Sequence, residues 1–83
     1  MYKRQITTSP DTSREALRLA LDALMPGGLL TAVLYWGHDG GRTEAEAVLA
    51  WAEALPTQRF HAQHLRSVNR RRPPTLLAID VLR

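Results

Sequence analysis

Cysteine is absent from the 83-residue sequence. Its absence excludes a disulfide framework and any metal site built on thiolates, and it favours a reducing compartment such as the cytoplasm. Long hydrophobic runs are also absent, since none approaches the roughly 20 residues that span a bilayer. No basic segment followed by an apolar run marks a secretory signal. We therefore expect a cytoplasmic protein that does not enter a membrane.

Lysine is nearly absent as well, because Lys3 is the only lysine and every other basic residue is arginine. It lies within Met-Tyr-Lys-Arg-Gln, residues 1–5, which resemble the translation of a transposon-end adapter used to build sequencing libraries. We predict that these residues are an adapter scar. Without Lys3 and Arg4, the 11 basic and 8 acidic residues become 9 and 8, so the net charge falls from +3 to +1. The high pI then says little about nucleic acid.

A chain of this length supports one compact unit at most. A capping box formed by Thr12 and Glu15 predicts the start of a helix, and Pro26 with the two glycines that follow predicts its end. The apolar run 29–35 comes directly after this turn. A short run without polar residues on either side is typical of a strand covered on both faces, as in α/β proteins.

A second capping box, Thr43 with Glu46, predicts a second helix that ends at Pro56. Residues 59–68 are polar on both sides and predict an edge strand, whereas residues 75–82 are apolar and predict an inner strand. The expected order is helix, strand, helix, strand, strand, with a right-handed parallel crossover followed by an antiparallel hairpin. An inner strand that comes last must insert beside the first strand. This is the strand order that closes one side of a Rossmann-like class I methyltransferase sheet.

Four motifs occur in order along residues 6–83. They are T-x-P-x-T at 8–12, P-G-G at 26–28, Y-x-G-H-x-G-G at 35–41, and Asn69 with Pro73 and Pro74. Each motif alone is a weak signal, but together they resemble the small bacterial class I methyltransferases labelled "putative rRNA methylases". Members of that family are assigned as tRNA methyltransferases that act on the aminomethyl-thiouridine at the wobble position.

The resemblance implies that residues 6–83 are the C-terminal half of a methyltransferase domain whose methyl donor is S-adenosylmethionine. It also implies an RNA substrate, with tRNA as the specific expectation. No G-x-G-x-x-G occurs in the sequence, so no cofactor-binding residue is assigned and the donor site is expected in a missing N-terminal half. We expect the fragment alone to be inactive.

The stretch from Tyr35 to Gly41 leaves the carboxyl end of the first predicted strand, which is where ligands bind in open α/β sheets. Methyl transfer needs a neutral acceptor amine aimed at the methyl carbon. Tyr35 and His38 are the candidate catalytic residues, because each can orient the amine and receive its proton. The structural alternative is that Tyr35 packs at the strand end and His38 bonds a loop carbonyl. The candidate substrate-binding residues are Trp36, Gly37, Gly40, Gly41, Asn69 and Arg70.

The physical reasons for these assignments differ from residue to residue. The three glycines permit sharp turns and close approach to a substrate, and the start of the following helix can hold an anion. Trp36 can stack on a base, although tryptophans more often pack in cores. Asn69 and Arg70 can grip an RNA backbone, although an arginine run in a hairpin loop is also explained as solvated surface.

A metal site is not expected. His61 and His64 have an H-x-x-H spacing, but a separation of three places two strand residues on opposite faces of a sheet. Two alternatives to the methyltransferase fragment remain at this stage. A small basic RNA-binding module without a cofactor would bind RNA with a steep salt dependence. A protein-interaction module would use its exposed sheet edge and apolar helix face, for example to form a homodimer.

Overall fold

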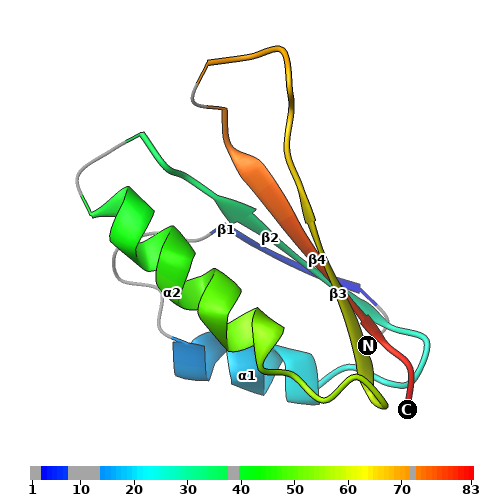
Figure 1. Cartoon of the computed structure of the whole chain (residues 1–83). Coiled ribbons are helices and arrows are strands. Elements are labelled where there is room, and N and C mark those ends of the chain that lie inside the picture. Colours follow the sequence, from blue (N-terminus) through cyan, green and yellow to red (C-terminus); the bar gives the residue numbers. More distant parts are fainter. Residues whose placement is uncertain (1–2, 8–13, 38–39, 72) are drawn as a thin grey trace.

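The computed structural model describes residues 3–7, 14–37, 40–71 and 73–83. Within these residues the chain forms two helices and four strands, in the order strand, helix, strand, helix, strand, strand (Figure 1). They are β1 (Lys3–Thr7), α1 (Arg14–Asp22), β2 (Leu29–Leu34), α2 (Gly41–Glu53), β3 (Phe60–Leu65) and β4 (Thr75–Val81). Of the two residues of the first predicted capping box, Glu15 lies in α1, whereas Thr12 lies outside the described residues.

The four strands form one sheet in the order β1-β2-β4-β3. The last strand, β4, is inserted between β2 and β3 and is antiparallel to both. Because β4 reverses direction relative to each neighbour, β2 and β3 run in the same direction. The predicted hairpin, the inner position of the last strand and the edge position of the polar strand are all confirmed.

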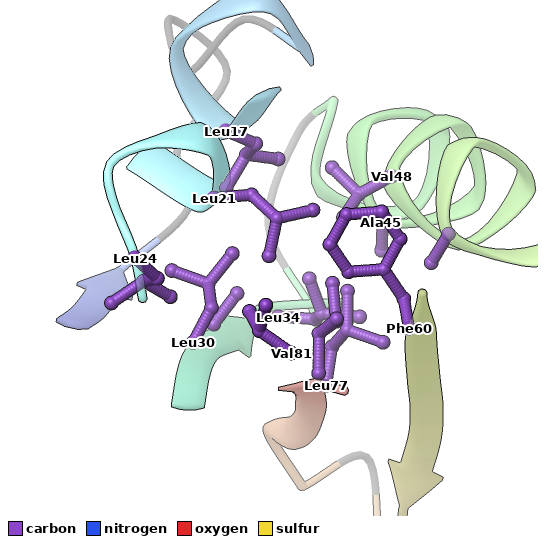
Figure 2. Close-up of a cluster of buried hydrophobic side chains, with 13 residues drawn as sticks. Leu17, Leu21, Leu24, Leu30, Leu34, Ala45, Val48, Phe60, Leu77 and Val81 are labelled. Atoms are coloured by element: carbon purple, nitrogen blue, oxygen red, sulfur yellow. The ribbon is translucent and has the colours of Figure 1, made fainter. Parts of the chain in front are cut away.

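One face of the sheet is covered by both helices. Alternate residues of β2 and β4 point toward the helices and are buried, and side chains from α1 and α2 close the layer above them. Figure 2 shows this apolar cluster between the helices and the sheet. Its largest fully buried side chains are Leu17, Leu30, Leu34, Val48, Leu77 and Ile79. Trp51 packs against the same cluster, which is the packing role expected for most tryptophans.

The other face of the sheet carries no helix of the described chain. Leu29, Thr31 and Val33 of β2 alternate with the buried residues and are only half-buried. The expectation that this strand is covered on both faces is therefore wrong for these residues. Its continuous apolar run predicts two buried faces, but both helices pack on the same side, so only one face is fully buried.

A strand that the sequence did not predict pairs with the outer edge of β2. Residues 3–7 form β1, which runs parallel to β2 with Lys3 opposite Leu29. The outer edge of β2 is therefore paired. A five-residue polar segment carries too little periodicity to predict a strand, and here the partner strand decides its conformation. The adapter origin of residues 1–5 stays a prediction.

The boundaries of both helices differ from the capping patterns. Helix α1 ends at Asp22, and the following turn contains Gly27 with a left-handed φ of 88°. This turn is fastened to the end of β4, because Gly27 N–H donates to the Val81 carbonyl at 2.7 Å and Val81 N–H donates to the Gly28 carbonyl at 2.9 Å. The P-G-G motif therefore joins the first helix to the last strand.

Helix α2 begins two residues before the predicted N-cap, Thr43, which lies within its first turn. The N-cap is Gly40, whose φ of 77° requires a left-handed conformation that glycine adopts without a steric penalty. Glu46 does not complete a capping box, because its carboxylate accepts a 2.8 Å hydrogen bond from Arg42. The helix therefore starts at the glycine pair, where Gly40 adopts the left-handed conformation, and not at Thr43. Neither helix of the described residues is long and apolar enough to cross a membrane.

Replacing Leu17 by alanine is expected to lower the free energy of unfolding by about 2–5 kcal/mol, because it removes a fully buried side chain and leaves a cavity. The matched control is Leu19→Ala on the same helix, where the side chain is 58% exposed and the change should stay within about 0.5 kcal/mol. Urea unfolding followed by circular dichroism measures both. Equal losses for the two variants would contradict the packing of α1 on the sheet.

Candidate functional site

Two connecting segments meet at one end of the sheet, which we call the rim. The first consists of the described residues 35–37 and 40, which follow the carboxyl end of β2, and the second of the described residues 66–71, 73 and 74 between β3 and β4. The pairings Leu34 with Thr75 and Leu65 with Leu76 place the ends of β2 and β3 beside the start of β4. Figure 1 shows the described parts of both segments at the same end of the sheet. The described residues of the two segments therefore lie near one another in space.

The first segment carries most of the predicted site residues. Tyr35 is 38% exposed, and a Cβ added at Gly37 would meet no atom within 4 Å, so there is open space beside the backbone at that point. Gly37 does not have a positive φ, so of the three predicted glycines only Gly40 needs its conformational freedom. Gly41 is buried as the first residue of α2. His38 lies outside the described residues.

Trp36 begins a hydrogen-bonded cluster that links three elements of the rim. Its indole Nε1–H donates to the hydroxyl oxygen of Thr75 at 2.9 Å, and the Nε2 of His64 lies 2.8 Å from the same oxygen. The centroids of the Trp36 and His64 rings are 6.2 Å apart, and the ring planes are tilted by 38°. Thr75, which is buried, thus fixes an indole and an imidazole at the first residue of β4.

The imidazole of His64 favours its neutral form. Partial burial lowers the pKa of His64 below its ordinary value of 6.5, and the positive charge of Arg66 lowers this pKa further. Both effects act against protonation, the first because an imidazolium loses hydration and the second because like charges repel. At neutral pH the cluster is therefore an uncharged aromatic surface with arginines beside it.

A hollow of about 600 Å³ opens between this cluster and the β3–β4 connection. We call it the rim hollow, and its lining includes Trp36, His64, Arg66, Val68, Arg70 and Thr75. Its volume lies within the range of about 300–1,000 Å³ that ligand pockets occupy. Of the predicted substrate-binding residues, the hollow brings together Trp36 and Arg70. Tyr35, Gly37, Gly40, Gly41 and Asn69 are not among its lining residues.

Asn69 lies at the exposed part of the second segment. Its side-chain oxygen accepts a 3.1 Å hydrogen bond from the Ser67 hydroxyl, which braces the loop between two of its own residues. Arg70 and Arg71 are exposed and lie outside the described strands and helices, so their charges face solvent at the rim.

The two strand histidines lie on opposite faces of the sheet, as their spacing predicts. His61 is opposite Asp80 on the helix-free face, with 3.7 Å between its Nδ1 and the carboxylate, whereas His64 bonds Thr75 on the helix side. The sequence did not indicate His64, Arg66 or Thr75 as site residues. The hairpin pattern already implied that the end of one strand and the start of the next are neighbours, but nothing in the sequence indicated that Thr75 bonds both rings.

The sheet defines the class of protein. An antiparallel last strand inserted between two strands of common direction, with both crossover helices on one face, is the architecture of the C-terminal part of a class I methyltransferase domain. The chain belongs to the family described as "Putative rRNA methylase", whose model matches residues 2–80.

Relatives of known name support this assignment. The chain is 39% identical over 74 residues to the chloroplastic tRNA (mnm(5)s(2)U34)-methyltransferase of Arabidopsis thaliana, which covers 89% of this chain and 27% of that protein. It is similar to the crystal structure of a "putative rRNA-methylase" from Clostridium thermocellum, with a TM-score of 0.83 and 32% identity. That match covers 96% of this chain and 46% of the solved one.

A second solved structure is a "putative methyltransferase" from Streptococcus mutans in complex with SAH, with a TM-score of 0.82 and 26% identity. The match covers 99% of this chain and 51% of that chain. The present chain thus spans about half the length of these two solved structures and about a quarter of the plant protein.

The imidazole of His64 should titrate below pH 6.5, and replacing Arg66 by glutamine should raise its pKa part of the way toward the ordinary value. The shift is partial because the desolvation of the ring remains. NMR titration of the ring protons measures both values, and Arg83→Gln, which removes a charge at the opposite end of the sheet, is the control. Because the unfolded chain binds this proton more tightly, stability should fall as the pH drops below about 6.5. A His64 pKa above 6.5 would contradict the described environment.

Replacing Thr75 by valine should destabilise the protein by about 1–3 kcal/mol, because the indole N–H and the imidazole both lose their partner at a part-buried position. Thr31→Val, on the helix-free face of β2, is the matched control and should have little effect. Urea unfolding compares the two variants. If Thr75→Val were no worse than Thr31→Val, the hydroxyl would not hold the cluster together.

Proposed function

We propose that these residues are the C-terminal half of an S-adenosylmethionine-dependent RNA methyltransferase that methylates the aminomethyl group of a modified wobble uridine in tRNA. The observation that carries the proposal is the 39% identity, over 74 residues, to a protein named as a tRNA (mnm(5)s(2)U34)-methyltransferase. The similarity to a methyltransferase solved with SAH, the demethylated form of S-adenosylmethionine, supports the choice of methyl donor.

The residues of this chain belong to the acceptor side of such a reaction. The glycine-rich G-x-G-x-x-G loop that would hold the donor is absent from the sequence, so no step through the cofactor is assigned to these residues. We place the donor site in a preceding half of the protein, and we expect the 83 residues alone to be inactive. The lengths of the solved relatives, about twice the length of this chain, support that division.

The role of the first rim segment is to position the acceptor. An attacking amine must be neutral and must lose one proton as its nitrogen gains a methyl group. Tyr35 and His38 are the proposed catalytic residues, with one orienting the amine and the other receiving its proton. The open space beside Gly37 leaves room for the acceptor to approach the backbone. The start of α2 at Gly40 and Gly41 is the proposed contact for a phosphate of the same nucleotide.

The second rim segment supplies RNA contacts. Arg70 is exposed beside the rim hollow, and its guanidinium can bind a phosphate in two-point geometry. Asn69, held by Ser67, presents its amide nitrogen at the loop surface and can read a base or a ribose. Trp36 is the proposed aromatic contact between the two segments.

The test uses the gene product that carries these residues together with the coding sequence that precedes Ile6 in the source DNA. Incubated with labelled S-adenosylmethionine, it should methylate tRNA that contains the aminomethyl-thiouridine and leave tRNA without the aminomethyl group unlabelled. His38→Ala should lower the rate by about 10²–10⁴-fold, the usual contribution of a general acid or base. The control is His61→Ala, at the opposite end of β3, which should retain the rate of the parent protein.

Two results would count against the proposal in different ways. Labelling of ribosomal RNA in place of tRNA would reject the tRNA substrate while keeping the methyltransferase. Equal rates for His38→Ala and the parent protein would reject the catalytic role of the histidine.

A further inference from the structure

We infer that the rim hollow binds an RNA nucleotide next to the target nucleotide, with its base against the Trp36 and His64 surface and its phosphates beside Arg66 and Arg70. This inference rests on the proposed function, because it takes RNA as the substrate. It adds a binding site for a second nucleotide and assigns Arg66 and His64 to substrate recognition.

The position of the hollow separates it from the proposed reaction site. Its lining includes Trp36 but not Tyr35 or Gly37, although these residues are neighbours in the chain. The hollow lies on the helix side of the rim, where Trp36 bonds Thr75 and where Leu49 of α2 forms part of the wall. An RNA strand that placed its target base beside Tyr35 would therefore bring an adjacent nucleotide to the hollow.

The walls of the hollow match the two parts of a nucleotide. One side is apolar and aromatic, since Trp36, Leu49, Val68 and Pro73 line it, and Val68 is 95% exposed at the tip of the second segment. A base that covers Val68 and the indole removes apolar surface from water, and base–aromatic stacking tolerates any base identity.

The charge of the hollow has one sign. Two arginines line it, and none of the described residues in its lining is acidic. Because the pKa of His64 is lowered, that ring favours its neutral form, and the positive charge of the hollow lies on the guanidinium groups of Arg66 and Arg70, which attract phosphates. Aromatic surface with arginines beside it is the combination that proteins use to bind single-stranded nucleic acid.

The distance between the rings determines how a base can bind. Rings with centroids 6.2 Å apart leave too little room for a base between them, because a sandwich needs about 7 Å, twice the optimal carbon–carbon separation of about 3.5 Å. The base therefore stacks on the side of the pair that faces the hollow. This geometry makes the indole ring, and not its N–H group, the contact that matters, since the N–H already bonds Thr75.

The test measures the binding of a short single-stranded RNA with the anticodon-loop sequence to the same gene product, over a range of salt concentrations. Each phosphate contact contributes about 0.7 to the slope of log affinity against log salt for single strands. Arg66→Ala and Arg70→Ala should each reduce the slope by about that amount. Arg83→Ala, which removes the same charge at the opposite end of the sheet, should leave the slope unchanged.

The stacking contact has a separate signature. Trp36→Leu should weaken RNA binding by about fivefold to a hundredfold, the range that loss of one base–aromatic stack produces, without changing the salt slope. Trp36→Phe keeps a ring but loses the bond to Thr75, so it should retain most of the affinity. If Trp36→Phe and Trp36→Leu lost affinity equally, the role of Trp36 would be structural, and the stacking inference would be overturned.

Methylation measured in parallel separates this inference from the proposed function. If tRNA is labelled but both arginine variants keep the salt slope of the parent protein, nucleotide binding at the rim hollow is rejected and the proposed function stands. Hollow-dependent RNA binding without methylation of any RNA would overturn the proposed function and support the nucleotide site.

Discussion

Antiparallel pairing of β4 with both of its neighbours is the constraint on which the rest of the structure depends. The strand is hydrogen-bonded to β2 on one side and to β3 on the other, and it contributes Leu77, Ile79 and Val81 to the core. Its two ends are tied separately. At one end the glycine turn before β2 bonds Val81, and at the other end Thr75 holds Trp36 and His64. The last strand thus connects the helix layer, the sheet and the rim.

This arrangement links fold stability to the chemistry of the site. The side chains of Thr75 and Leu77 point to the same face of β4. The hydroxyl that bonds Trp36 and His64 therefore lies next to the apolar core. A buried hydroxyl at the end of a packed strand has little freedom, and the two rings that it bonds inherit that rigidity. The arginines beside them lie on exposed backbone without such support. The neutral aromatic cluster, held by the strands, therefore lies beside charged residues of the β3–β4 connection.

The sequence predicted the parts of the fold that depend on hydrophobic pattern. The apolar runs of β2 and β4 and the polar character of β3 gave the strand order, because a strand without an apolar side belongs at an edge. It failed where tertiary contacts decide. Residues 3–7 have no apolar periodicity, yet they pair with β2, and the left-handed Gly40 starts α2 before the capping pattern of Thr43.

The positions of the site segments could be predicted, but the contacts between their side chains could not. The glycine-rich segment was expected at the carboxyl end of the first predicted strand, and the arginine run in the hairpin loop between the last two strands. The roles of Thr75, His64 and Arg66 could not be predicted. The bonds of Thr75 to Trp36 and His64 join side chains 39 and 11 positions apart along the chain. Arg66 lies in an irregular loop. His64 in particular looked like half of a metal motif, and only the register of β3 against β4 places it beside Thr75.

The connection between β3 and β4 begins and ends on neighbouring, hydrogen-bonded strands. Because its ends are already held together, lengthening it adds only loop-closure entropy, about 0.6 kcal/mol for each doubling of its length. The core beneath would be unaffected, since Thr75 and Leu77 lie beyond the loop. Relatives of this protein can therefore differ in the length and sequence of this one segment at little cost in stability.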